Sequence, residues 1–201
     1  MKFPRILTLL LAGFVLAFPA TALHLGKNLP QWQADLNSGN RTVRLLAARA
    51  IGEMAIAREP GAAAAVFAAL DHDDSAVRYW AVVAAAQMGE AARPAEKKLQ
   101  SLLDDPAPEV RIGSAFALAK LGRVDEGVEA LIREMGNPDK GARLYAVDAL
   151  DNLGEQARAA VPVLRRAVTD EFDYVQRIAR HALWVLGERP CPYKKCEGGS
   201  Q

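Results

Sequence analysis

The chain has 201 residues, of which 24% are charged and 51% hydrophobic, and this composition is typical of a folded globular protein. Its 25 Lys and Arg residues and 24 Asp and Glu residues leave a net charge of +1. So small a charge would not attract nucleic acid or an anionic membrane without specific contacts, and neither is expected as a partner. The low aromatic content of 6% and the abundance of alanine favour helices that pack closely through small side chains.

Residues 1–22 have the pattern of a cleavable secretory signal peptide. Lys2 and Arg5 precede an apolar run over residues 6–18, and a small-x-small cleavage site ends at Ala22. A membrane anchor is the alternative, but about 13 apolar residues rise only about 20 Å as a helix, against about 30 Å of hydrocarbon. We therefore expect cleavage near Ala22 and a periplasmic or secreted protein that is not attached to a membrane.

A pattern of about 33 residues recurs five times after the signal peptide. Each copy has a marker, Val-Arg in its clearest form, and the marker positions are 34, 33, 32 and 33 residues apart. An alanine stands six residues after each marker, and a glycine stands eleven residues after the marker in four of the copies. The marker positions are Arg44, Arg78, Arg111, Arg143 and Gln176. The glycines are Gly89, Gly122, Gly154 and Gly187, and Ala55 takes their place in the first copy. Five copies in register predict a repeat protein.

Helical spacing of apolar residues predicts two helices in each copy. The first, which we name the marker helix, has small or apolar residues one before the marker and three, six, seven and ten after it, and the glycine suits its C-terminal cap. The anchors of the second helix are Val66 and Leu70, Leu99 and Leu103, Leu131 and Met135, and Leu164 and Val168. Prolines at the joins are Pro60, Pro94, Pro106 and Pro138. Trp32 and Leu36 predict a further helix in an N-terminal cap over residues 23–39, followed by about four and a half repeats over 40–188 and a tail over 189–201.

The recurring Val-Arg, Ala, Ala-Leu and Gly positions, followed by a second amphipathic helix, resemble HEAT repeats of the short type, which also occur in phycobilisome-lyase-like proteins. The resemblance covers residues 28–188. The segments Asp74–Ala81 and Asp105–Arg111, with Tyr174-Val175, are also similar to the HEAT-repeat region appended to some bacterial secreted sulfatases. The resemblance implies an all-α fold, a right-handed α-solenoid (an armadillo-like superhelix) of HEAT-like helix pairs.

The HEAT resemblance also implies a polar ladder between repeats, in which an acidic residue six places before each arginine pairs with it. Asp105 and Arg111 fit this rule, but Ser38, His72 and Asn137 occupy the acidic position in other copies. We therefore expect a structural ladder that is partly hydrogen-bonded instead of fully ionic. The residues assigned to it are Arg44, Arg78, Asp105, Arg111, Arg143 and Asp170.

Partner binding is expected along the concave surface, which the resemblance assigns to the second helices. Alignment of these helices gives two rows of residues that do not face the core. The first row is Phe67, Gln100, Ile132 and Arg165, and the second is Ala68, Ser101, Arg133 and Arg166. Both rows change from small and apolar to basic, which would suit a protein partner with an apolar tip and an acidic flank. A solvated face with extended arginines is the alternative.

The sequence shows no constellation that would support catalysis. The three histidines are scattered, and no phosphate-binding glycine loop, nucleophile elbow or sulfatase Cys/Ser-x-Pro-x-Arg motif is found. We predict a protein that is not an enzyme and binds no cofactor or metal. His72, in a turn with three aspartates, is interpreted as a solvated residue in preference to a metal ligand. Trp80, Tyr145 and Trp184 are interpreted as packing residues in preference to a ligand-stacking platform.

Cys191 and Cys196 are the only cysteines and lie in the C-terminal tail. A disulfide is predicted between them in an oxidising compartment, with two free thiols or a two-ligand metal site completed by a partner as alternatives.

Together these features predict an exported, non-enzymatic scaffold that binds another protein, with a role as accessory module to a secreted hydrolase such as a sulfatase as a special case. The alternative is a factor that attaches or removes a chromophore, like the bilin lyases. That alternative is weaker because the likeness is confined to the repeat and the signal peptide points to export.

Overall fold

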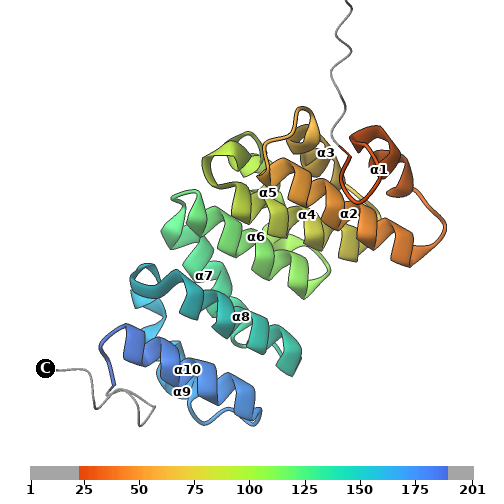
Figure 1. The fold of residues 1–201 in the computed structure, drawn as a ribbon. Coiled ribbons are helices and arrows are strands. Elements are labelled where there is room, and N and C mark those ends of the chain that lie inside the picture. Colours follow the sequence, from red (N-terminus) through yellow and green to blue (C-terminus); the bar gives the residue numbers. More distant parts are fainter. Residues whose placement is uncertain (1–22, 190–201) are drawn as a thin grey trace, which may run out of the picture.

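The structure, a computed structural model, describes residues 23–189 and consists of two layers of helices (Figure 1). The marker helices are α2 (Arg41–Ile56), α4 (Ser75–Met88), α6 (Pro108–Lys120), α8 (Lys140–Leu153) and α10 (Asp173–Val185). The second helices are α3 (Ala62–Ala69), α5 (Glu96–Ser101), α7 (Val124–Glu134) and α9 (Val161–Ala167). Short 3-10 segments are η1 (Gly89–Ala95), η2 (Leu102–Asp104) and η3 (Gly154–Ala160).

The predicted all-α fold is confirmed, since residues 23–189 contain an isolated bridge between His24 and Lys27 but no strand. The helix pairs stack in chain order into a right-handed α-solenoid. None of the helices in this range is long and apolar enough to cross a membrane.

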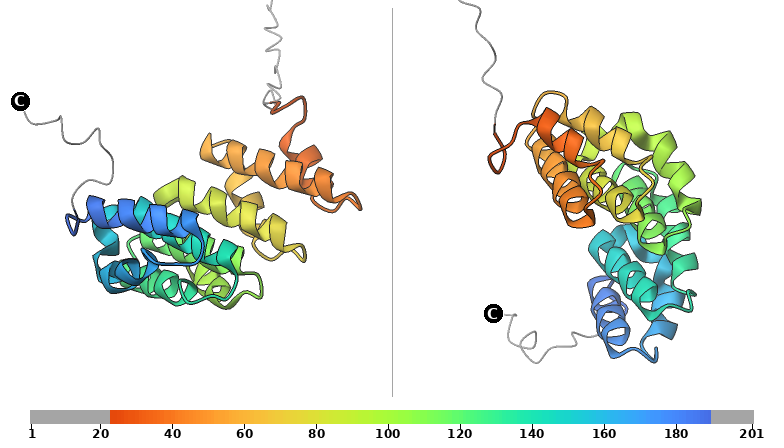
Figure 2. Two further views of the ribbon diagram at one scale, coloured as in Figure 1. Left: turned by 90° about the horizontal axis from the view of Figure 1, so that it is seen from below. Right: turned by 90° about the vertical axis from the view of Figure 1, so that its right-hand side faces the viewer.

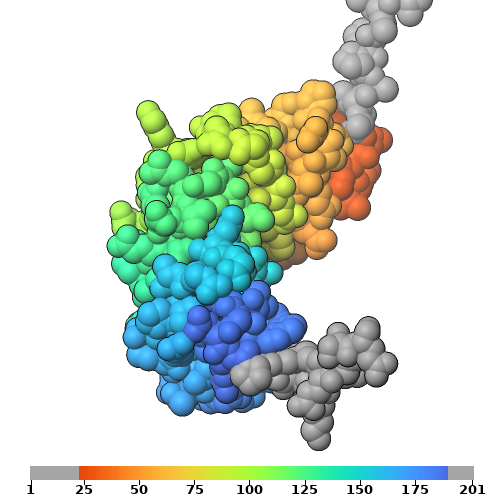
Figure 3. Space-filling view, turned by 90° about the vertical axis from the view of Figure 1, so that its left-hand side faces the viewer, coloured from red at the N-terminus to blue at the C-terminus, as the bar shows by residue number. Residues whose placement is uncertain are grey.

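The marker helices line the inner side of the arc that the array forms. In the right-hand view of Figure 2 the marker helices lie on the inner side of the arc, and the second helices lie outside them. The space-filling view in Figure 3 shows the same bow, with the repeats stacked in chain order. Tyr79 of α4 and Tyr145 of α8 line one hollow above α6, on the side towards which the array curves. The expectation that the second helices form the concave surface is therefore wrong.

The core consists of two clusters of buried residues, and helix α6 contributes side chains to both. Val110, Leu118 and Leu121 in and just after this helix belong to the cluster that extends back to α1, whereas Ile112 and Ala115 belong to the cluster that extends forward to α10. Because each helix pair covers the apolar side of its neighbours, no repeat buries its own core alone.

The marker helices end where the repeat pattern predicts. The four glycines eleven residues after the marker all have positive φ, for example +93° at Gly122, a conformation that costs glycine little. In the first copy, which has no glycine there, α2 continues to Ile56 and the chain turns at Arg58 with φ +62°.

The first helix of the fold, α1 (Leu29–Asp35), covers the exposed side of α2. Asn28 and Gln31 form a reciprocal capping box at its N-terminus. Trp32 is buried, and its indole N–H donates a hydrogen bond to the carbonyl oxygen of His24. This helix takes the position of a missing preceding repeat.

Candidate interaction surface

Four arginines of the marker helices join successive repeats through partly buried ion pairs. In three cases the guanidinium reaches an aspartate that precedes the next marker helix, and in the fourth it reaches Glu134 at the end of α7. Arg78 Nε, for example, lies 2.8 Å from Asp105 Oδ2, and Nη2 lies 2.8 Å from Oδ1. The four pairs are Arg44–Asp74, Arg78–Asp105, Arg111–Glu134 and Arg143–Asp170. All six residues assigned to the ladder lie in it, but Asp74 and Glu134 were missed. The ladder is ionic at each of these four arginines.

The same arginines also bind the backbone six residues earlier. Arg78 Nη1 donates to the carbonyl oxygen of His72, and Arg111 Nη1 donates to that of Asp105. The predicted pairing of the Asp105 and Arg111 side chains is therefore wrong, because the Asp105 carboxylate binds Arg78 of the preceding repeat. A carbonyl oxygen is available in any residue, which explains why the side chain six places before the marker varies.

The ladder carboxylates also hold the start of the next marker helix. Asp105 Oδ1 accepts a hydrogen bond of 2.9 Å from the backbone N–H of Ala107, and Asp74 accepts one from Ala76. Burial raises the pKa of Asp105, but the hydrogen bonds from Arg78 and Ala107 outweigh it, so the pKa lies below its usual value. Each aspartate therefore connects one repeat to the next and caps a helix at once.

The rows predicted on the second helices lie on the outer side of the arc, and most of their larger members are already engaged. Phe67 packs partly buried on the core, and Gln100 donates to both oxygens of Glu126. Arg165 pairs with Glu188. Among the eight residues, the structure brings Ile132 and Arg166 into one shallow hollow of about 240 Å³. The exposed members include Ala68, Ser101, Arg133 and Arg166.

Exposed apolar side chains gather on the marker helices instead. From α1 to the end of the described chain, each exposed large hydrophobic residue belongs to a marker helix. These residues are Leu46, Ile56, Tyr145, Tyr174 and Val185. Tyr145 is 53% exposed and does not fit the interpretation as a packing residue, whereas Trp80 packs partly buried against the core and Trp184 is half-buried. Helical spacing alone does not distinguish the inner face of a marker helix from its buried face, so the sequence does not show which of these aromatic residues is exposed.

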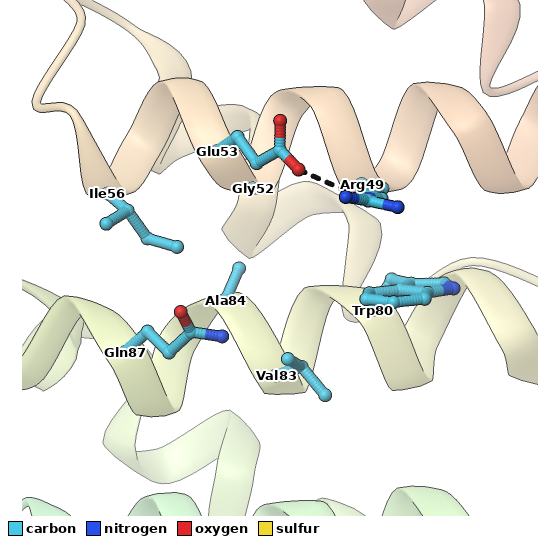
Figure 4. Close-up of a pocket in the computed structure, with 8 residues that line it drawn as sticks. All are labelled: Arg49, Gly52, Glu53, Ile56, Trp80, Val83, Ala84 and Gln87. Atoms are coloured by element: carbon cyan, nitrogen blue, oxygen red, sulfur yellow. Dashed lines mark hydrogen bonds and ion pairs between the residues drawn. The ribbon is translucent and has the colours of Figure 1, made fainter.

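A groove lies between α2 and α4 on the inner face, near the N-terminal end of the array. It measures about 370 Å³, and Figure 4 shows Trp80 and Val83 on one wall and the ion pair of Arg49 and Glu53 on the other. Arg49 Nε donates to Glu53 Oε1 at 2.8 Å, and that hydrogen bond lowers the pKa of Glu53. The charged groups of this groove thus neutralise one another.

A second hollow of about 310 Å³ lies at the centre of the inner face, across three marker helices. Its lining residues are Tyr79, Val83, Glu109, Ile112, Gly113, Phe116, Tyr145, Asp148, Ala149 and Asn152. The hollow thus brings together two carboxylates, Glu109 and Asp148, and three aromatic rings, those of Tyr79, Phe116 and Tyr145.

The histidines are held in structural contacts. His72 Nδ1 accepts from the N–H of Asp74, and Nε2 lies 3.0 Å from the carbonyl oxygen of Leu36, so both ring nitrogens are engaged. His181 lies against Asp151 at 2.8 Å and stacks edge-on with Trp184. Over residues 23–189 no three His, Cys, Asp or Glu side chains come together as metal ligands. Cys191 and Cys196 lie outside the described residues, and their predicted pairing stays a prediction.

The comparison with family models matches HEAT repeats at residues 29–96 and 95–184, and the chain belongs to the HEAT-repeat family. Comparison with curated proteins found no match. The structure is similar to that of the complex of CpcE and CpcF of phycocyanin lyase from Nostoc sp. PCC7120, with a TM-score of 0.61 and 24% identity over 88% of this chain and 71% of that one. It is also similar to an engineered protein, with a TM-score of 0.58 and 24% identity over 79% and 78% of the two chains. A designed armadillo repeat protein in complex with peptide (KR)4 has a TM-score of 0.57 and 22% identity over 79% and 81%. These likenesses concern the fold.

Proposed function

We propose that this chain is a non-enzymatic scaffold that binds a partner protein along the inner face of its arc. The observation that carries the proposal is the distribution of exposed apolar side chains, which from α1 onward belong to the marker helices that line that face. Exposing such residues weakens solubility, and contiguous apolar surface commonly marks a protein interface. Similar repeat folds form a two-subunit complex and a peptide complex, which supports a polypeptide partner.

We further propose that the scaffold acts after export, in the periplasm or outside the cell. The support is the signal-peptide pattern of residues 1–22. A role as accessory module to a secreted hydrolase such as a sulfatase is supported by the likeness of segments Asp74–Ala81 and Asp105–Arg111 to the repeat regions of those enzymes. Co-purification with a sulfatase from the exported fraction would test that role.

The experiment that tests the scaffold is capture of partners from the exported fraction with inner-face and outer-face variants. Tyr145→Glu and Leu46→Glu place charge on the inner face, and both positions are exposed, so the fold should tolerate them. Ala68→Glu and Arg166→Glu are the matched outer-face variants. We expect only the inner-face variants to lose the partner, with unchanged helical content by circular dichroism. Loss confined to the outer-face variants would contradict the proposed surface, and turnover of a sulfate ester by the purified protein would contradict the non-enzymatic role.

The second candidate function is chromophore attachment or removal in the manner of bilin lyases. The fold likeness to the phycocyanin lyase complex, which extends over 88% of this chain, favours it over other enzymatic roles. Purified protein incubated with a bilin and a bilin-accepting protein would show transfer of absorbance to the acceptor if this candidate holds. Absence of transfer, together with capture of a protein through the inner face, would favour the scaffold.

A further inference from the structure

The central hollow of the inner face exists because one large side chain is missing there. At the position two residues after the marker, the other four copies carry Leu46, Trp80, Tyr145 and Ile178, whereas the third copy carries Gly113. Gly113 also packs tightly on α4, since a Cβ at this position would lie 2.9 Å from Val82 Cγ1. The result is a recess in the floor of the array, with the ring of Tyr145 on one wall and that of Phe116 nearby.

The recess holds two carboxylates that lack a cationic partner in the described part of the chain. Asp148 accepts a hydrogen bond from the amide of Asn152 at 3.2 Å, and Glu109 meets the hydroxyl of Ser75 at 3.5 Å, but neither forms an ion pair over residues 23–189. Arg78 and Arg111 attract Glu109 electrostatically, but the ion pairs of these two guanidiniums are made with Asp105 and Glu134. The ladder carboxylates are paired, and these two are not.

The environment of the recess would strengthen binding of a cation. Asp148 is exposed to solvent, but partial burial still raises the pKa of its carboxyl and the nearby charge of Asp151 raises it further, so an approaching positive charge would stabilise the ionised form. Burial likewise raises the pKa of Tyr79, which keeps its phenol neutral. Neutral aromatic rings attract a cation through their faces and cover the aliphatic part of its side chain.

We infer that this recess binds the side chain of an arginine on an extended segment of the partner protein, with its guanidinium between Glu109 and Asp148 and its methylene groups against Phe116 and Tyr145. Charge complementarity selects a cation, and the flat guanidinium fits both the carboxylates and the aromatic rings better than a lysine ammonium does. The inference rests on the proposed function, since it assigns the chemistry that the inner face recognises.

The test is an NMR titration of the full chain with the peptide acetyl-Ala-Leu-Arg-Leu-Ala-amide and with the same peptide carrying citrulline, which has the shape of arginine without its charge. We expect the arginine peptide to shift the amide signals of Gly113 and Phe116 and to bind at least about tenfold more tightly than the citrulline peptide, as charge-assisted hydrogen bonds predict. Asp148→Asn and, separately, Glu109→Gln should reduce binding of the arginine peptide towards the citrulline level.

Glu129→Gln is the matched control, because it removes one negative charge from the exposed surface of the outer helix α7. Equal binding of the two peptides, or an equal loss in Glu129→Gln, would overturn the inference, since either result shows that the recess does not select the charge. Failure of Asp148→Asn to alter peptide binding, while Tyr145→Glu still abolishes partner capture, would overturn the arginine site and leave the scaffold standing. If Tyr145→Glu and Leu46→Glu both still captured the partner, the scaffold proposal itself would be rejected.

Discussion

Replacement of Asp105 by asparagine tests whether the ladder contributes to the free energy of unfolding of the array. The Asp105 side chain is 4% exposed, and that of its partner Arg78 is 14% exposed. Asparagine keeps the size of the side chain and an oxygen that accepts the hydrogen bond from Ala107, so the turn before α6 is preserved. The substitution therefore removes the negative charge with little other change.

The expected loss follows from what Arg78 retains. Breaking a buried ion pair by removing one partner costs about 3 to 5 kcal/mol, because a charge remains buried without compensation. Arg78 keeps hydrogen bonds to the carbonyl oxygens of His72 and Asp73, at 2.8 and 2.9 Å, which hold part of its charge. We therefore expect Asp105→Asn to lower the free energy of unfolding by about 2 to 3 kcal/mol, below that range. Asp105→Ala should cost about 1 kcal/mol more, since it also removes the oxygen that binds Ala107.

Urea unfolding at pH 7, followed by circular dichroism at 222 nm, measures both losses. Asp71→Asn is the control, because Asp71 pairs with Lys98 on the surface, with 69% of its side chain exposed, and exposed pairs contribute about 0 to 1 kcal/mol. If Asp105→Asn lowers the free energy of unfolding no more than Asp71→Asn does, the ladder does not stabilise the junction between repeats. A changed denaturant slope would show that the array unfolds in parts, and the free energies would then have to be assigned to those parts.

Three further predictions concern single positions and pH. The buried hydroxyl of Ser114 has no hydrogen-bond partner among the described residues, and the other four copies carry alanine there, so Ser114→Ala should raise the free energy of unfolding by about 1 kcal/mol in the same urea assay. Arg58→Gly should raise it by about 1 kcal/mol, because φ of +62° strains a residue with a Cβ, and a fall would show that Arg58 makes contacts worth more than the strain. The pKa values of the four ladder carboxylates are lowered in the folded state, so their stabilisation is complete above about pH 5, begins to fall near pH 4 and is lost as the pH falls further through the lowered folded-state pKa values, which urea midpoints at pH 7, 5, 4 and 3 would show.

The helices and their ends could be predicted from the sequence because the same local pattern recurs in each copy of the repeat. Gly122, for example, marks the end of its helix through a backbone preference that is local to a few residues. The ladder could be predicted only in part, because the carboxylate that binds Arg78 lies 27 residues ahead, and Glu134 takes the role of an aspartate in one copy. Nothing in the spacing alone indicates which of two nearby carboxylates an arginine will reach across a junction.

The direction of the bow could not be predicted from periodicity, since both layers have equally regular helices, but the small residues of the inner layer account for it. A Cβ on Gly52 would lie 3.0 Å from Ala84 Cβ, and one on Gly113 would lie 2.9 Å from Val82 Cγ1, so adjacent marker helices approach closely on the inner side. An array whose inner helices are closer together than its outer helices must curve towards the inner layer. The same glycine therefore bends the array and opens the recess: at Gly113 the missing side chain lets α6 approach α4 and leaves room, on the surface, for a side chain from another protein.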